Sequence, residues 1–249
     1  MLAKRIILIL TILVLAAIGA VLIWLSTGQH NYIGVVPYQA PKHLKYTTIT
    51  SPEGCLMEPS SSSENPIGFV LYPGGKIAPE AYLPVAASLA EMGLSVFIVK
   101  TPYNMAFFAP GSGRRIRESR PDIQRWLIGG HSLGGIIASS IAAANPENWD
   151  GLILFASYTT GRSDLSGTDL PVLSIYGSDD YLVPPAATHA NARYLPVDSM
   201  YVNIPGANHA GFGYYGPQKG DGEATITVEE QRVKISSAVK VFLDRNGGF

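Results

Sequence analysis

The stretch that decides the fold is Gly129-Gly130-His131-Ser132-Leu133-Gly134-Gly135, which contains the pattern Gly-x-Ser-x-Gly. An apolar run, Trp126-Leu127-Ile128, precedes it, and residues 136–144 after it are rich in alanine and isoleucine. These runs predict a buried strand before the stretch and a helix after it. The chain is therefore expected to turn sharply from strand to helix at Ser132.

A turn this tight leaves room only for small residues, because the helix that follows comes close to the strand that precedes it. Gly130 and Gly134 provide that room, and Ser132 is held at the tip of the turn. The N-terminus of the helix directs its free N–H groups and the positive end of its dipole toward the same place. The pattern predicts that Ser132 is a nucleophile; the alternative is an ordinary serine in a turn.

Outside this stretch the chain alternates apolar strands with helical segments. Further buried strands are expected at 67–72, 94–99, 152–156, 172–176 and 201–204, and a threonine-rich strand is expected before them at 44–50. Helices are expected at 79–92, at 114–124, after Pro184-Pro185 and from Thr227 onward. Strands that are apolar throughout and separated by helices predict an α/β fold with a mostly parallel central sheet and helices on both faces. Residues 157–171 are too few to form a cap domain.

Composition limits the functions open to the chain. Its 249 residues are enough for one α/β domain plus an N-terminal anchor. The 18 Lys and Arg residues nearly balance the 19 Asp and Glu residues, and no basic cluster suggests a nucleic-acid partner. Cys55 is the single cysteine, which excludes an intrachain disulfide and a cysteine-rich metal site. We expect neither a metal nor a cofactor.

The N-terminus has the features of a membrane span. Residues 6–25 carry no charge and are long enough, at 1.5 Å per residue, to cross a hydrocarbon core of ~30 Å. Lys4 and Arg5 precede this run and no basic residue follows it until Lys42, so the positive-inside rule assigns residues 1–5 to the cytoplasm. We expect a transmembrane anchor at 6–25, a stalk at 26–43 and an extracytoplasmic domain at 44–249. The alternative is a cleaved signal peptide and a secreted protein.

A nucleophilic serine needs a base within hydrogen-bond reach and an acid that orients the base. Of the five histidines, only His209 lies in a glycine-rich loop just after a predicted strand. The side chain of His131, inside the turn, is expected to be directed away from the neighbours of Ser132. The acid is expected in the loop after the strand at 172–176, where we choose Asp180 and keep the adjacent Asp179 as the alternative.

The order Ser132, Asp180, His209, together with Gly-x-Ser-x-Gly, resembles the α/β-hydrolase superfamily over about residues 44–245. The chain is most similar to small dienelactone-hydrolase-like and lipase-like members without a lid, although dienelactone hydrolases use Cys where this chain has Ser132. It also resembles membrane-anchored or secreted bacterial hydrolases that share its run at 212–222. The register of the family's acid loop selects Asp180.

The resemblance also implies an oxyanion hole. Tyr72-Pro73-Gly74-Gly75 stands where the family has its oxyanion strand end, with Pro73 in place of the usual His. It implies that the backbone N–H of Leu133 and that of Gly75 or Lys76 bind the oxyanion.

These features favour a serine hydrolase, either esterase or lipase-like, that cleaves a small-molecule or lipid ester through an acyl-enzyme. The alternatives are an acyltransferase on the same fold and a non-catalytic binding module anchored to the membrane. Four side chains after the strand at 94–99 either form an apolar wall for the acyl group or pack as an ordinary loop: Tyr103, Met105, Phe107 and Phe108. The run from Phe212 to Gly222 either shapes the rim of the site or is a turn-rich loop.

Overall fold

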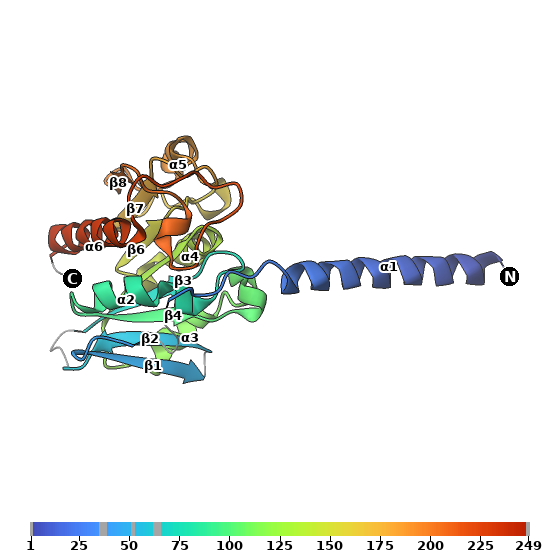
Figure 1. Ribbon diagram of the computed structural model, residues 1–249, viewed down its shortest axis with the longest axis horizontal. Coiled ribbons are helices and arrows are strands. Elements are labelled where there is room, and N and C mark those ends of the chain that lie inside the picture. Colours follow the sequence, from blue (N-terminus) through green and yellow to red (C-terminus); the bar gives the residue numbers. More distant parts are fainter. Residues whose placement is uncertain (1, 35–38, 51–52, 62–65, 248–249) are drawn as a thin grey trace.

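The computed structural model describes residues 2–34, 39–50, 53–61 and 66–247, which fold around one eight-stranded sheet (Figure 1). The strands lie in the order β1-β2-β4-β3-β5-β6-β7-β8. Their bounds are β1 Leu44–Thr50, β2 Glu53–Pro59, β3 Ile67–Tyr72, β4 Leu94–Val99, β5 Arg125–His131, β6 Gly151–Phe155, β7 Val172–Gly177 and β8 Met200–Ile204. The pairs β1–β2 and β2–β4 are antiparallel and the others are parallel. The predicted mostly parallel sheet is confirmed.

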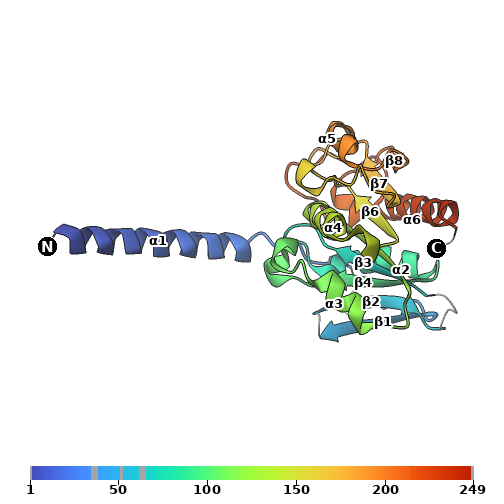
Figure 2. The same cartoon turned by 180° about the vertical axis from the view of Figure 1, so that it is seen from behind.

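Helices cover both faces of the sheet, as expected. α2 (Leu83–Ala90) and α6 (Val228–Arg245) lie on one face, and α3 (Ser112–Ser119) and α4 (Leu133–Ala144) lie on the other, which is in front in Figure 2. Successive side chains of a strand point to opposite faces. In β3, Phe69 and Leu71 join the core under α2 and α6, whereas Val70 and Tyr72 join the core under α3 and α4. Two covered faces explain why the strands are apolar throughout.

Three local features differ from the sequence prediction or refine it. β2 was not predicted, since Gly54 to Met57 are all buried and show no alternation. The helix expected at 114–124 is α3, which ends at Ser119, because the residue before Pro121 is disfavoured in a helix. The helix expected at 79–92 is a 3-10 turn, Pro79–Tyr82, followed by α2. The predicted capping box at Thr227 and Glu230 is confirmed. The helix expected after Pro184-Pro185 is α5, Pro185–Asn191.

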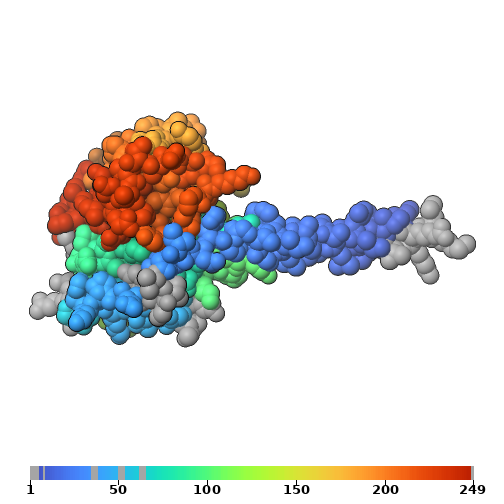
Figure 3. All heavy atoms as spheres, in the orientation of Figure 1, coloured from blue at the N-terminus to red at the C-terminus, as the bar shows by residue number. Residues whose placement is uncertain are grey.

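The N-terminal segment is a single helix, α1 (Leu2–Ser26), that projects away from the domain (Figure 3). Within the described chain it is the one helix long and apolar enough to cross a membrane, although a signal sequence at the N-terminus has the same properties. The segment at 26–43 was expected to be a stalk. Its described part instead lies on the domain, because His30 N–H donates to the carbonyl of Lys76 at 2.7 Å and Ile33 N–H to that of Tyr214 at 3.1 Å. Residues 35–38 lie outside the described chain.

The carboxyl ends of the parallel strands all lie at one edge of the sheet, which we call the carboxyl edge. The loops that follow β3, β4, β5, β7 and β8 at this edge carry the predicted site residues. α1 leaves the domain at the same edge, and both views show it extending away from there (Figures 1 and 2).

Candidate active site

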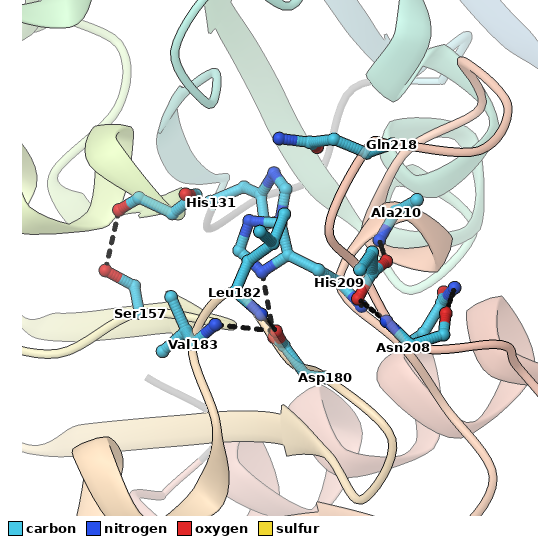
Figure 4. Close-up of polar contacts among 12 residues, drawn as sticks. His131, Ser157, Asp180, Leu182, Val183, Asn208, His209, Ala210 and Gln218 are labelled. Atoms are coloured by element: carbon cyan, nitrogen blue, oxygen red, sulfur yellow. Dashed lines mark hydrogen bonds and ion pairs between the residues drawn. The ribbon is translucent and has the colours of Figure 1, made fainter.

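Ser132 lies at the turn between β5 and α4 in a backbone conformation that is rare for a residue with a side chain, φ 52° and ψ −123°. Two hydrogen bonds hold this strained turn. The N–H of Ser132 donates to the carbonyl of Phe155 at 3.0 Å, and the hydroxyl of Ser157 donates to the carbonyl of Ser132 at 2.7 Å (Figure 4). The side chain remains partly exposed. The serine is thus fixed in place and accessible, as a nucleophile requires.

The two flanking glycines are required by close approach of the backbone. A Cβ at Gly134 would overlap the carbonyl oxygens of Tyr72 and Pro73, and one at Gly130 would overlap the carbonyl group of Gly134. Neither obstacle is a flexible side chain that can move aside. The first turn of α4 therefore packs directly on β3 and β5, which is the steric reason for glycine expected from the sequence.

Asp180 and His209 form a buried pair. Asp180 Oδ2 lies 2.8 Å from His209 Nδ1, and Oδ1 accepts the N–H groups of Leu182 at 2.9 Å and Val183 at 2.7 Å (Figure 4). The two side chains are 0% and 1% exposed. Because a carboxylate oxygen accepts, Nδ1 of His209 is the donor and Nε2 keeps its lone pair, which is the tautomer that a general base needs. Asp179 accepts from the Ser178 hydroxyl at 3.3 Å instead, so Asp180 is the one that reaches the histidine.

Ser132 sits beside this pair. The ring of its neighbour His131 lies 4.5 Å from the ring of His209, which brings the turn and the histidine loop together. In the described chain no hydrogen bond joins the Ser132 hydroxyl to His209. A catalytic hydrogen bond is often long or poorly aligned before substrate binds.

The histidine loop is anchored by the end of the run at 212–222. Asp221 accepts the N–H of His209 at 3.2 Å and that of Ala210 at 2.8 Å, while the Asn208 side chain donates to the carbonyl of Gly222 at 2.8 Å. This part of the run therefore positions His209, a role that the sequence left undecided. An Asp-Gly pair a dozen residues after the histidine was the available signal, but turns commonly contain the same pair.

The expectation that His131 is directed away from the neighbours of Ser132 is wrong. Its ring is fully buried against His209 and lies 5.8 Å from the ring of Phe212 in a stacked arrangement. Burial holds the pKa of His131 well below its ordinary value, and the nearby His209 acts in the same direction. A neutral imidazole therefore lies against the predicted base.

A tyrosine links His131 to the loop after β3. The Gly74 N–H donates to the Tyr82 hydroxyl at 2.9 Å, and that hydroxyl lies 2.8 Å from Nδ1 of His131. The Tyr82 hydroxyl therefore bridges the backbone of Gly74 and Nδ1 of His131, one of the two nitrogens of that ring. Among the described residues, Nε2 has no hydrogen-bond partner.

The structure distinguishes the two residues proposed for the first oxyanion N–H. The N–H of Lys76 donates to the carbonyl of Asn104 at 2.7 Å and is therefore occupied. Within the described chain, neither the N–H of Gly75 nor that of Leu133 has a hydrogen-bond partner. A Cβ at Gly75 would lie 3.2 Å from Leu133 Cδ2, so the two residues are neighbours at the start of α4. Gly75 and Leu133 are the pair of free donors.

The four residues of the predicted apolar wall differ in burial. Met105 is buried, and its sulfur lies 3.7 Å from the place a Gly75 Cβ would occupy, beside the free donors. Tyr103, Phe107 and Phe108 are 45%, 43% and 45% exposed. Tyr103 and Phe108 line a cavity of about 750 Å³ at the root of α1, whose lining does not include Ser132. Met105 is therefore the member of the predicted wall that the structure places in contact with Gly75.

Two further observations concern the metal-ligating and thiol groups of the described chain. In the part of the chain that the structure describes, no group of His, Cys, Asp or Glu side chains is arranged to hold a metal ion. Burial raises the pKa of the Cys55 thiol to about 11, so this cysteine stays protonated and is a poor nucleophile at neutral pH.

Comparison with known proteins places this geometry in context. A family model described as "Alpha/beta hydrolase family" matches residues 68–233, which is more than half of the chain. This range includes Ser132, Asp180 and His209. No curated protein matches the sequence.

Solved structures share the fold at low sequence identity. Est1E from Butyrivibrio proteoclasticus superposes with a TM-score of 0.57 at 15% identity, covering 84% of this chain and 100% of Est1E. The structure of Est1E with bound ferulic acid gives a TM-score of 0.60 at 16% identity, covering 84% and 98%. A predicted CIB-like hydrolase from Thermoplasma acidophilum gives 0.56 at 17% identity, covering 79% and 97%. At such identities the likeness is one of fold.

Proposed function

Because the chain belongs to the α/β hydrolase family, we propose that it is a serine hydrolase in which Ser132, His209 and Asp180 form a catalytic triad that cleaves a carboxylic ester. The observation that carries the proposal is the buried 2.8 Å contact between Asp180 and His209, next to a serine held at a strained turn. A structural histidine would need neither the strained serine nor the two free N–H groups nearby.

The proposed reaction begins with attack by Ser132 Oγ on the carbonyl carbon of the ester. His209 Nε2 takes the hydroxyl proton during attack, and the imidazolium then gives that proton to the departing alkoxide. Asp180 stabilises the imidazolium through Nδ1. A water molecule, deprotonated by His209, then attacks the acyl-enzyme, and collapse of the second tetrahedral intermediate releases the acid and returns the proton to Ser132.

The negative charge of the tetrahedral intermediate needs donors that are in place beforehand. The N–H groups of Gly75 and Leu133 are free and adjacent, and Leu133 is the first residue of α4, where the helix dipole is positive. We assign the oxyanion hole to these two groups and leave Lys76 out of it, because its N–H is already donated to Asn104.

The fold relatives and the N-terminus support the substrate class and the location that we propose. Est1E binds ferulic acid, which supports a carboxylic acid or ester as the ligand of this fold. α1 supports attachment of the domain to a membrane, with the domain outside the cytoplasm. We therefore propose a small-molecule or lipid ester as substrate and a single-pass membrane location, with secretion after cleavage of α1 as the alternative.

The decisive experiment is labelling with a fluorophosphonate probe, followed by assays on esters of different acyl length. Wild-type protein should be labelled at Ser132 and hydrolyse ester, whereas Ser132→Ala should do neither. Ser140→Ala, on the exposed side of α4, is the matched control and should behave as wild type. Labelling of Ser132→Ala to the wild-type level would disprove the assignment, and product formed mainly on an added alcohol would indicate an acyltransferase.

A further inference from the structure

The end of α1 is attached to the loop that carries the proposed oxyanion donor. Lys76 Nζ donates to the carbonyl of Trp24 at 2.6 Å and lies 3.9 Å from the centre of the Trp24 ring. A cation at the C-terminus of a helix is stabilised by its free carbonyl groups and dipole. The Asn104 side chain donates to that of Gln29 at 2.9 Å, which adds a second tie. The last turn of α1 is thus tied to Lys76, the residue that follows Gly75.

Exposed apolar side chains gather at the same edge of the molecule. Among the described residues outside α1, nine large apolar side chains are exposed, and six of them are in the loops of the carboxyl edge: Ile33, Tyr103, Phe107, Phe108, Tyr181 and Leu182. All the aromatic ones are in this group. The other three are valines, of which Val233 and Val241 are on α6. A one-sided group of exposed aromatic side chains is typical of a surface that contacts a partner or a membrane interface.

The cavity at the root of α1 has the charge expected of a site for anions. Its lining contains Lys100 and Arg115 and no aspartate or glutamate. It also includes Ser26 and Gln29, from the end of α1 and just after it. If α1 spans a bilayer, this cavity is at the level of the lipid headgroups, whose phosphate groups are complementary to the two cations.

We propose that the carboxyl edge rests in the headgroup layer of a phospholipid bilayer, so that the ester substrate enters the site from the lipid rather than from water. This inference rests on the proposed function of Ser132 and on α1 as an anchor. Three independent features agree with it: the attachment of α1 to Lys76, the one-sided exposure of aromatic side chains, and the cationic cavity. Met105 connects this surface to the oxyanion donors, because its carbonyl accepts the Phe108 N–H at 3.0 Å and its buried side chain lies beside Gly75.

The first test measures orientation and does not require activity. The full chain is reconstituted in vesicles of phosphatidylcholine and phosphatidylglycerol, with Phe108→Cys carrying a nitrobenzoxadiazole label. Val233→Cys is the matched control on α6, and wild type serves as the labelling blank because Cys55 is buried. Lipids bearing a nitroxide at the headgroup should quench the label at 108 strongly and that at 233 weakly. Equal quenching at both positions would overturn the proposal.

The second test measures the route of the substrate. Two esters with the same leaving group are compared, 4-methylumbelliferyl oleate carried in the vesicles and 4-methylumbelliferyl acetate in water. For the double variant Phe107→Ser/Phe108→Ser, the ratio of kcat/KM on oleate to that on acetate should fall roughly tenfold or more, because two half-exposed aromatic rings no longer enter the lipid.

The double variant Val233→Ser/Val241→Ser should leave this ratio at the wild-type value. An equal ratio in both double variants would contradict entry from the lipid. If wild type hydrolyses neither ester and is not labelled by a fluorophosphonate, the proposed function fails instead, and the quenching experiment still decides the orientation of the carboxyl edge.

Discussion

The hydroxyl of Tyr82 offers a direct test of how the oxyanion loop is held. Tyr82→Phe removes one oxygen atom and keeps the ring. It takes away the acceptor of the Gly74 N–H, at 2.9 Å, and the hydrogen-bond partner of His131 Nδ1, at 2.8 Å, both in a fully buried setting. Gly74 directly precedes Gly75, whose N–H we assign to the oxyanion hole.

The expected size of the effect follows from these two lost bonds. Each buried group left without a partner costs about 1–3 kcal/mol, so the loss of two partners should lower the free energy of unfolding by about 2–6 kcal/mol. Complete removal of one oxyanion donor costs about 10²–10³ in kcat. Because Tyr82→Phe loosens the loop without removing the Gly75 N–H, we expect a loss of about ten- to a hundredfold in kcat.

Tyr72→Phe is the matched control. The Tyr72 hydroxyl is also buried, accepts from the Gly113 N–H at 2.9 Å and donates to the carbonyl of Pro110 at 3.2 Å. Its loss should lower stability by a similar amount, but its partners lie toward α3 and not in the oxyanion loop. The assay is kcat on a soluble ester, with urea denaturation of both variants in the same detergent. If Tyr72→Phe loses as much kcat as Tyr82→Phe, the link between Tyr82 and the oxyanion loop is refuted.

Three further variants probe the base and its neighbours. Asp180→Asn should lower kcat on esters by about 10⁴-fold, because an amide no longer fixes the Nδ1–H tautomer of the base. Asp221→Asn should lower kcat by roughly tenfold with little change in KM, measured on the same ester, since the charged acceptor of the His209 and Ala210 N–H groups is lost. The pKa of His131 is lower in the folded chain than its unfolded value near 6.5, so its contribution to stability is complete above that pH and is lost as the pH falls below it. Urea denaturation at pH 7.5 and 5.5 should show a smaller pH dependence for His131→Asn than for wild type.

Local patterns were sufficient to predict most of the fold. The strands at 44–50, 67–72 and 94–99 have the bounds expected, because each is an apolar or threonine-rich run between turn residues. The strand-turn-helix at Ser132 needed only its own seven residues and their flanks. β2 escaped prediction because it lies between β1 and β4 and is buried from Gly54 to Met57, which leaves no period in the sequence.

Contacts between distant parts of the chain could not be read from the sequence. The Tyr82 hydroxyl and His131 are 49 residues apart, and Lys76 and Trp24 are 52 apart. The choice between Gly75 and Lys76 as oxyanion donor depends on the carbonyl of Asn104, which belongs to the next loop along the carboxyl edge. Asp180, in contrast, was selected by the register of a short loop, and the loop geometry agrees with that choice.

Backbone strain connects the site to the stability of the whole domain. In the described chain, five residues other than glycine have positive φ: Lys76, Tyr103, Asn104, Ser132 and Ala156. They lie directly after β3, β4, β5 and β6, all at the carboxyl edge. Each such residue costs about 1–3 kcal/mol and persists only when the surrounding structure holds it. The strands and helices packed on the two faces of the sheet hold these residues in place. At Lys76 and Asn104, the strained backbone accompanies the hydrogen bond from the Lys76 N–H to the Asn104 carbonyl. The N–H of Lys76 is thereby occupied, whereas that of Gly75 is free in the described chain.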